Sequence, residues 1–200
     1  MKPTVVMLPG AGGRRALLAE VAARLPGRTV TVCGYPGLDG VAAAPELSTL
    51  DDLMQRLLAG LPERFDLVAK SMGSVLALRL VLAAPQRVRR LVLLATTGGL
   101  DVAAEGAAEW REAFVRAYPE APRWFVDDRS DVEAELGRVQ QPTLLLFGEA
   151  DELAPVAVGR RLLAGLPRAR LEVLAAATHD LEGEQPDLVA ALIEAHLEGA

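Results

Sequence analysis

Short apolar runs alternate with longer amphipathic segments along the chain. The runs are rich in leucine and β-branched residues, and we expect them to form buried strands at Thr4–Leu8, Thr29–Cys33, Phe65–Ala69, Leu91–Ala95, Thr143–Phe147 and Arg170–Leu174. The segments between them have a helical period, and we expect helices at Arg14–Leu25, Leu50–Leu61, Met72–Ala84, Pro155–Leu166 and Pro186–Leu197. This alternation predicts a three-layer α/β sandwich, in which a mostly parallel six-stranded sheet carries helices on both faces.

Polar residues and prolines mark the starts of three of these helices. Ser48 or Thr49 is a candidate N-cap for the second helix, whose first turn carries two aspartates. Pro155 and Pro186 suit first-turn positions, where a missing backbone N–H is harmless.

One long segment interrupts the alternation between the fourth and fifth strands. We expect residues 98–138 to form a short helical lid inserted into the sheet, and this segment is called the insert below. Five of the eight aromatic residues lie in it: Trp110, Phe114, Tyr118, Trp124 and Phe125. The first three are spaced for one helical face, so they either attach the lid to the body or line an apolar substrate pocket, and both roles can hold together.

Length and charge restrict the possible function classes. A chain of 200 residues, 51% of them hydrophobic, predicts a single domain over residues 1–200 with one well-buried core. The net charge of −6 leaves no basic surface for phosphates, so we expect no nucleic-acid partner. The sequence carries no signal for a particular oligomeric state.

Cysteine usage and hydropathy indicate the compartment. Cys33 is the only cysteine, which excludes an intramolecular disulfide and a cysteine-rich zinc site. The apolar run near the N-terminus is broken at Pro9 and is too short for a signal-peptide core, and no uncharged run approaches membrane-spanning length. We therefore expect a soluble cytoplasmic protein that binds no membrane, metal or cofactor.

Ser71 is the candidate nucleophile. It stands between the third strand and the following helix, where small residues two positions before and after it, Ala69 and Gly73, permit a sharp turn. Such a turn exposes the hydroxyl and places the Met72 N–H at the helix start, where it can donate to a developing oxyanion. The alternative is that Ser71 only caps the helix.

Two later strand ends supply the partners that a serine nucleophile needs. Asp151 follows the fifth strand, and His179 follows the sixth. An imidazole takes the proton of the hydroxyl, and a carboxylate orients the imidazole. Glu149 and Glu152 compete with Asp151 for the acid role, and Asp151 alternatively serves as a charge at a helix N-terminus. The other histidine, His196, is expected at the surface of the last helix.

The loop after the first strand is the fourth part of the candidate site. Its glycines, in the sequence 10–13, allow backbone N–H groups to point at a bound oxygen, and Ala11 is the expected second oxyanion donor. A dinucleotide-binding fingerprint is a competing interpretation of this loop. That fingerprint requires a glycine where Arg15 stands and an acidic residue at the end of the second strand, where the chain has Cys33, Gly34 and Tyr35.

With these residues in place, the chain resembles the α/β-hydrolase superfamily over essentially its whole length. It is similar to a minimal member that starts at the strand before the oxyanion loop, and in that family the lid follows the strand after the nucleophile helix. Two positions depart from the family pattern: Ala69 replaces a commoner glycine, and Pro9 replaces a histidine that helps hold the oxyanion loop. Lys70 is expected to be a solvated or sheet-edge charge, with substrate contact as the alternative.

The resemblance and the residues together predict a serine hydrolase. We expect Ser71 to attack an ester or thioester of a small molecule, with His179 as base, Asp151 as orienting acid, and an acyl-enzyme that water releases. Two alternatives remain open: the same triad used in C–C bond hydrolysis, lyase or perhydrolase chemistry, and a ligand-binding or signalling protein with little turnover.

Overall fold

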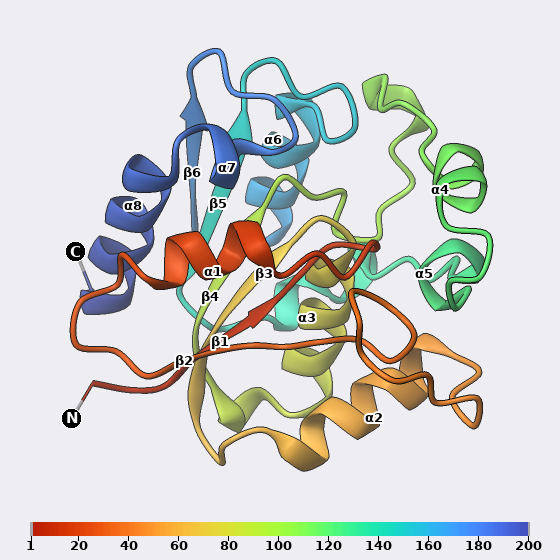
Figure 1. Cartoon of the computed structure of the whole chain (residues 1–200). Coiled ribbons are helices and arrows are strands. Elements are labelled where there is room, and N and C mark those ends of the chain that lie inside the picture. Colours follow the sequence, from red (N-terminus) through yellow and green to blue (C-terminus); the bar gives the residue numbers. More distant parts are fainter. Residues whose placement is uncertain (1, 200) are drawn as a thin grey trace.

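The computed structural model describes residues 2–199 and contains one six-stranded sheet, drawn in Figure 1. The strands follow the order β2-β1-β3-β4-β5-β6, and every neighbouring pair is parallel. Their bounds are β1 Val5–Leu8, β2 Val30–Val32, β3 Phe65–Lys70, β4 Val88–Leu94, β5 Thr143–Gly148 and β6 Ala169–Leu174. The predicted six-stranded sheet is confirmed, and β4 begins three residues earlier than expected.

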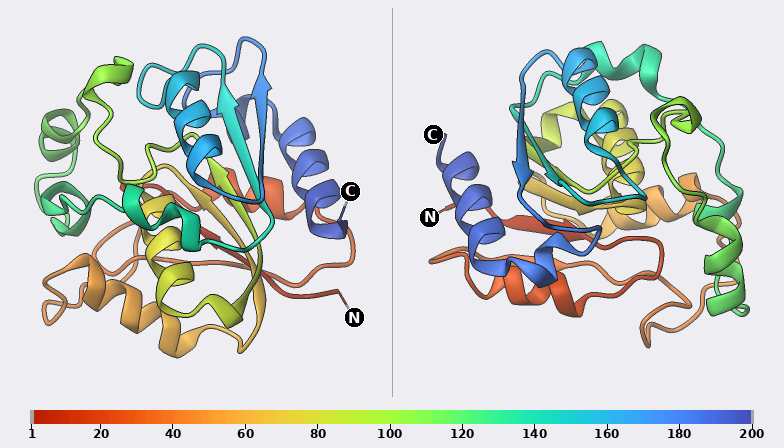
Figure 2. Two further views of the ribbon diagram at one scale, coloured as in Figure 1. Left: turned by 180° about the vertical axis from the view of Figure 1, so that it is seen from behind. Right: turned by 90° about the horizontal axis from the view of Figure 1, so that it is seen from above.

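Helices cover both faces of the sheet, as Figure 2 shows from behind and from above. The α-helices of the body are α1 Ala16–Ala22, α2 Leu50–Gly60, α3 Met72–Ala83, α6 Val156–Gly165, α7 Leu181–Glu184 and α8 Pro186–Glu198. One core cluster joins α2, α3 and α6 to the sheet, and a second joins α1, α7 and α8 to its other face. The three-layer sandwich is thus confirmed, because two apolar cores lie on opposite sides of one sheet.

Helix boundaries follow the sequence signals in α2 and α8 and depart from them in α1 and α6. Thr49 is the N-cap of α2 and forms a capping box with Asp52, in which each side chain accepts a hydrogen bond from the other residue's backbone N–H. Pro186 occupies the first turn of α8. Pro155 has an extended backbone and precedes α6 instead of lying in its first turn. The first helix begins two residues later than expected, at Ala16.

The insert contains only short helices. They are η2 Ala103–Glu105, α4 Arg111–Ala117, α5 Trp124–Asp127 and η3 Glu133–Arg138, and α4 and α5 project to one side of the sheet in Figure 1. Trp124 and Phe125 are buried, so α5 attaches the insert to the body. Trp110, Phe114 and Tyr118 form a row of touching rings, with centroid separations of 5.8 and 5.0 Å along the row. Attachment to the body is therefore carried by α5, and the substrate-pocket role of Trp110, Phe114 and Tyr118 stays a prediction.

His196 is buried, which corrects the expectation of a surface position. Its side chain faces the start of β5, where Nε2 lies 3.2 Å from the carbonyl oxygen of Pro142. The surface position was expected because His196 lies near the end of the last helix. In the structure, the last turn of α8 packs on the sheet together with the rest of the helix.

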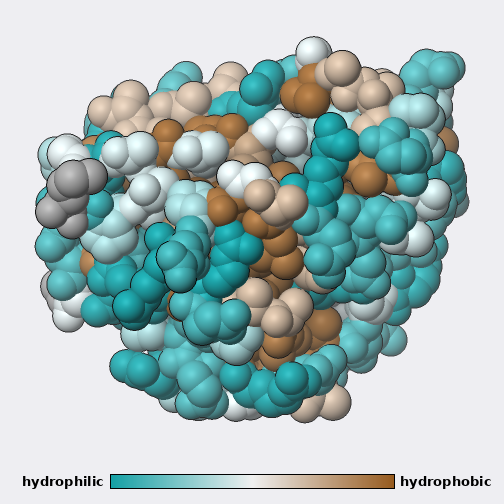
Figure 3. All heavy atoms as spheres, turned by 90° about the horizontal axis from the view of Figure 1, so that it is seen from below, coloured by the Kyte–Doolittle hydropathy of each residue, from teal (hydrophilic) through white to brown (hydrophobic). Residues whose placement is uncertain are grey.

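The face of the molecule seen from below is mainly hydrophilic, with hydrophobic residues in a central strip and in smaller patches nearer the top of the view (Figure 3). No helix within residues 2–199 is long and apolar enough to cross a bilayer.

Candidate active site

Ser71 lies in a strained turn between β3 and α3. Its backbone has φ 53° and ψ −126°, a conformation that costs a non-glycine residue about 1–3 kcal/mol. The turn is held from both sides, because the Ser71 N–H donates to Leu94 O at 2.8 Å and the Thr96 hydroxyl donates to Ser71 O at 2.9 Å. The Ser71 side chain makes no capping hydrogen bond to α3. The helix-cap alternative therefore does not describe this residue.

Gly73 explains why the turn needs a small residue on its helix side. A Cβ at this position would lie 2.3 Å from the carbonyl oxygen of Pro9. The first turn of α3 therefore touches the loop after β1, and only glycine permits that approach.

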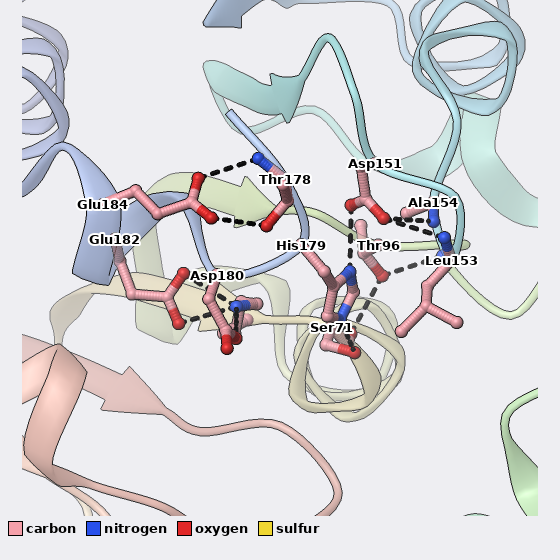
Figure 4. Close-up of polar contacts among 12 residues, drawn as sticks. Ser71, Thr96, Asp151, Leu153, Ala154, Thr178, His179, Asp180, Glu182 and Glu184 are labelled. Carbon is pink, nitrogen blue, oxygen red and sulfur yellow. Dashed lines mark hydrogen bonds and ion pairs between the residues drawn. The ribbon is translucent and has the colours of Figure 1, made fainter. Parts of the chain in front are cut away.

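His179 joins Ser71 to Asp151 in an unbroken chain of polar contacts (Figure 4). Its Nε2 lies 3.1 Å from Ser71 Oγ, and its Nδ1 lies 2.9 Å from Asp151 Oδ2. An ionised carboxylate only accepts hydrogen bonds, so in the neutral imidazole the proton belongs on Nδ1 and Nε2 is free to accept from the serine hydroxyl. This is the arrangement in which an imidazole can remove the proton of Ser71.

Asp151 is held as a carboxylate. Burial of its side chain opposes ionisation, but the contact with His179 and backbone N–H groups outweigh burial and keep the pKa of Asp151 below its ordinary value. Those N–H groups belong to Leu153 and Ala154, at 2.8 and 2.9 Å from Oδ1. The rivals Glu149 and Glu152 are exposed, and Glu149 accepts from the Ala176 N–H instead.

The loops that carry the acid and the histidine are in direct backbone contact. A Cβ on Gly148, the last residue of β5, would lie 2.4 Å from Ala177 O and 2.5 Å from Thr178 O. The Thr178 N–H donates to Glu184 of α7 at 2.8 Å. The histidine loop is therefore fixed against β5 on one side and against α7 on the other.

The glycine-rich loop after β1 borders the nucleophile. A Cβ on Gly10 would lie 3.3 Å from Ser71 Cβ, so the loop and the turn are neighbours. Ala11 and Met72 line the same cavity as Ser71. Among residues 2–199, neither backbone N–H of these two residues donates a hydrogen bond to another residue.

Tyr35 holds this loop, a role that the sequence did not reveal. Its buried hydroxyl donates to Pro9 O at 2.8 Å. The family's usual histidine is absent at position 9, and a tyrosine three residues after β2 contacts the loop instead. The available signal was an aromatic residue with a polar tip shortly after a strand, since a buried tyrosine hydroxyl needs a partner.

Lys70 is buried and ion-paired, which corrects the expectation of a solvated or sheet-edge charge. Its ammonium contacts Glu182, also buried, at 2.6 Å, and lies 3.4 Å from Asp180. A lysine that ends a strand of otherwise buried residues was the available signal, because buried lysines are paired.

Three hollows lie near Ser71, and all three have Met72, Trp110 and Leu153 in their linings. A cavity of about 170 Å³ is lined by Ser71, His179, the glycine-rich loop and the aromatic row of the insert. A larger cavity of about 490 Å³ lies under the insert and includes Arg111 and Arg129. Trp110 borders both cavities and the small hollow of about 20 Å³ between Ser71 and Leu153. Among residues 2–199, no cluster of His, Cys, Asp and Glu is suited to hold a metal ion.

Comparison with known proteins agrees with this architecture. The model of the alpha/beta hydrolase fold family matches residues 3–133, which includes Ser71 but ends before Asp151 and His179. The chain is 30% identical to a pimeloyl-[acyl-carrier protein] methyl ester esterase of Chromobacterium violaceum, over 98% of this chain and 94% of that protein.

Two further similarities cover most of the chain. It is 28% identical to a 2-hydroxy-6-oxononadienedioate/2-hydroxy-6-oxononatrienedioate hydrolase of Cupriavidus pinatubonensis, over 85% of this chain and 78% of that protein. Its fold matches the crystal structure of a hydrolase from Pseudomonas aeruginosa with a TM-score of 0.81 and 23% identity, over 100% of this chain and 91% of the other. The family match and the similarity over nearly the whole chain show that the protein is a hydrolase of the α/β-hydrolase family.

Proposed function

We propose that the protein cleaves a carboxylic ester or thioester of a small molecule through an acyl-enzyme on Ser71. The contacts that link Ser71 to His179 and His179 to Asp151 carry this proposal. Ser71 and His179 also line a cavity in which a small substrate can bind. A hydroxyl needs a base to attack a carbonyl at neutral pH, and this chain supplies the base and its orienting acid.

In the proposed reaction, His179 takes the Ser71 proton as Oγ bonds to the carbonyl carbon. The N–H groups of Ala11 and Met72 stabilise the oxyanion, and His179 returns the proton to the leaving alcohol or thiol. Water, deprotonated by His179, then attacks the acyl-enzyme, and the tetrahedral intermediate collapses to the acid and free Ser71.

The pocket favours a modest acyl group. The cavity beside Ser71 has an aromatic wall formed by Trp110, Phe114 and Tyr118, and its volume of about 170 Å³ limits what fits before the insert moves. The similarity to a methyl ester esterase supports an ester with a small alcohol portion. The single buried and free thiol of Cys33 suits a reducing compartment, and we propose the cytoplasm.

The decisive experiment replaces Ser71 by alanine. Ser71→Ala should abolish both turnover of short-chain p-nitrophenyl esters and labelling by a fluorophosphonate, with an unchanged circular dichroism spectrum. Ser48→Ala, at the surface before α2, is the matched serine control and should label as the parent does. Full labelling of Ser71→Ala would refute the assignment.

C–C bond hydrolysis with the same three residues is the second candidate. The similarity to the 2-hydroxy-6-oxononadienedioate/2-hydroxy-6-oxononatrienedioate hydrolase favours it. A protein that labels at Ser71 but turns over no member of an ester and thioester series would support this candidate over the first.

A further inference from the structure

The buried charges beside the nucleophile turn take no part in the proposed mechanism. We propose that the Lys70–Glu182 ion pair positions His179 relative to Ser71 and so sets the rate of the reaction. This inference rests on the proposed roles of Ser71 and His179, and it adds two positioning residues to them.

The pair has a well-defined geometry inside the protein. Lys70 Nζ donates to both carboxylate oxygens of Glu182, at 2.6 and 2.7 Å, and lies 3.4 Å from Asp180 Oδ1. Lys70 is 5% exposed and Glu182 is 3% exposed. An ammonium has three N–H donors, and these three oxygens occupy them all. Lys70, Asp180 and Glu182 also line the cavity beside Ser71, and there the Lys70 donors are engaged by these carboxylate oxygens.

Lys70 and Glu182 are close in sequence to the two residues that carry the reacting atoms. Lys70 is the last residue of β3 and directly precedes Ser71. Asp180 directly follows His179, and Glu182 lies in the first turn of α7. The ion pair thus joins the two segments that carry Oγ and Nε2, one residue from the nucleophile and three from the base.

The other residues of α7 contact parts of the protein other than β3. Leu181 packs in the core, Gly183 lies against Leu17 of α1, and Glu184 binds Thr178. Asp151 fixes the opposite side of the imidazole through Nδ1. Within residues 2–199, Lys70 makes the only hydrogen bonds or ion pairs between β3 and α7. On the same side of the loop, Asp180 also lies 3.7 Å from Arg14, which follows the glycine-rich loop.

A contribution to the stability of the fold is a weak explanation for burying the Lys70–Glu182 ion pair. Desolvating two charges opposes their attraction, and well-packed apolar replacements of buried ion pairs are often as stable or more stable. A positioning role therefore predicts different effects on stability and on activity: replacing both charges should preserve the fold and slow the reaction.

The test is the double variant Lys70→Met/Glu182→Leu. Its free energy of unfolding should equal or exceed that of the parent, while kcat for p-nitrophenyl acetate falls about 10- to 100-fold and KM changes less than about twofold. Lys2→Met, which breaks a lysine ion pair with Glu194 far from the site, is the control and should retain kcat. A folded double variant with parental kcat would overturn the proposal.

A milder variant covers the case in which the double variant does not fold. Glu182→Gln retains the side-chain size and one oxygen acceptor for Lys70, so it should fold and lose less of kcat than the double variant. Lys70→Arg retains the charge and should keep more of kcat than Lys70→Met. Equal kcat for Glu182→Gln and the parent, together with equal losses for Lys70→Arg and Lys70→Met, would contradict a role for the ion pair.

A readout independent of turnover separates this inference from the proposed function. The Nδ1–H proton of His179 can be followed by NMR, and His196→Gln distinguishes the two histidines of the chain. Its signal should broaden or shift in Glu182→Gln if the loop moves, and an unchanged signal would overturn the positioning role. Absence of fluorophosphonate labelling in the parent would instead count against the nucleophile assignment.

Discussion

Gly148 and Ala177 are in backbone contact, because a Cβ at Gly148 would lie only 2.4 Å from the Ala177 carbonyl oxygen. The end of β5 and the loop that carries His179 therefore approach as closely as two main chains can. The 2.9 Å contact between Asp151 and His179 depends on that approach.

Gly148→Ala should separate the acid from the base. The added methyl group must displace backbone atoms, so we expect a loss of about 1–3 kcal/mol in the free energy of unfolding and roughly a 100-fold loss of kcat. Gly60→Ala, where a Cβ meets no atom within 4 Å, is the matched control and should leave kcat unchanged. Urea unfolding and ester hydrolysis measure both quantities, and parental kcat in Gly148→Ala would show that the contact is dispensable.

Tyr35→Phe should weaken the oxyanion loop without altering the core. The change removes only the hydroxyl that donates to Pro9 O, and leaves that carbonyl unpaired at a cost of about 1–3 kcal/mol of stability. We expect kcat to fall about tenfold or more with little change in KM, since an oxyanion donor acts in the transition state.

Thr143→Val provides the comparison for Tyr35→Phe. It removes another buried hydroxyl that donates to a backbone carbonyl, Gln141 O, at the opposite end of a strand. Thr143→Val should lose stability and keep kcat. Equal kcat losses in the two variants would mean that Tyr35 acts on stability alone.

The sequence predicted the parts of this protein that local chemistry determines. Six strands were recognisable as short apolar runs, and the runs of β1, β3 and β5 are buried on both faces. Ser71, Asp151 and His179 could be brought together in advance because each follows a strand, and parallel strands end at one edge of the sheet.

The parts that could not be predicted depend on contacts between distant residues. Lys70 and Glu182 are 112 positions apart, so the pairing that buries them is invisible in either local sequence. His196 was misassigned for the same reason, since its burial depends on how α8 lies on β5. The helix α7 has only four residues, which is too short for a periodic signal.

His196 should make the protein sensitive to mild acid. Burial, aided by the positive charges of Arg170 and Arg90, lowers the pKa of His196 to about 4 from its ordinary 6.5. Between these two values the unfolded chain binds the proton more tightly than the folded one, so stability is full above about pH 6.5 and falls as the pH drops toward 4.

His196→Gln should remove that dependence while keeping a donor for Pro142 O. Between pH 7 and pH 5, the parent should lose about 2 kcal/mol more of its free energy of unfolding than the variant. Urea titrations at the two pH values provide the measurement, and parallel losses in both proteins would show that His196 is protonated in the folded state.

Trp110→Ala should broaden the range of accepted substrates, because this large side chain borders two cavities. It borders both the hollow of about 170 Å³ beside Ser71 and the hollow of about 490 Å³ under the insert. Removing the indole gives a longer acyl chain more room beside Ser71, and we expect kcat/KM for long relative to short p-nitrophenyl esters to rise roughly tenfold. Phe114 borders only the smaller cavity, so Phe114→Ala should shift this ratio less. If the two variants shift chain-length preference equally, general loosening of the insert explains the change better than removal of the indole.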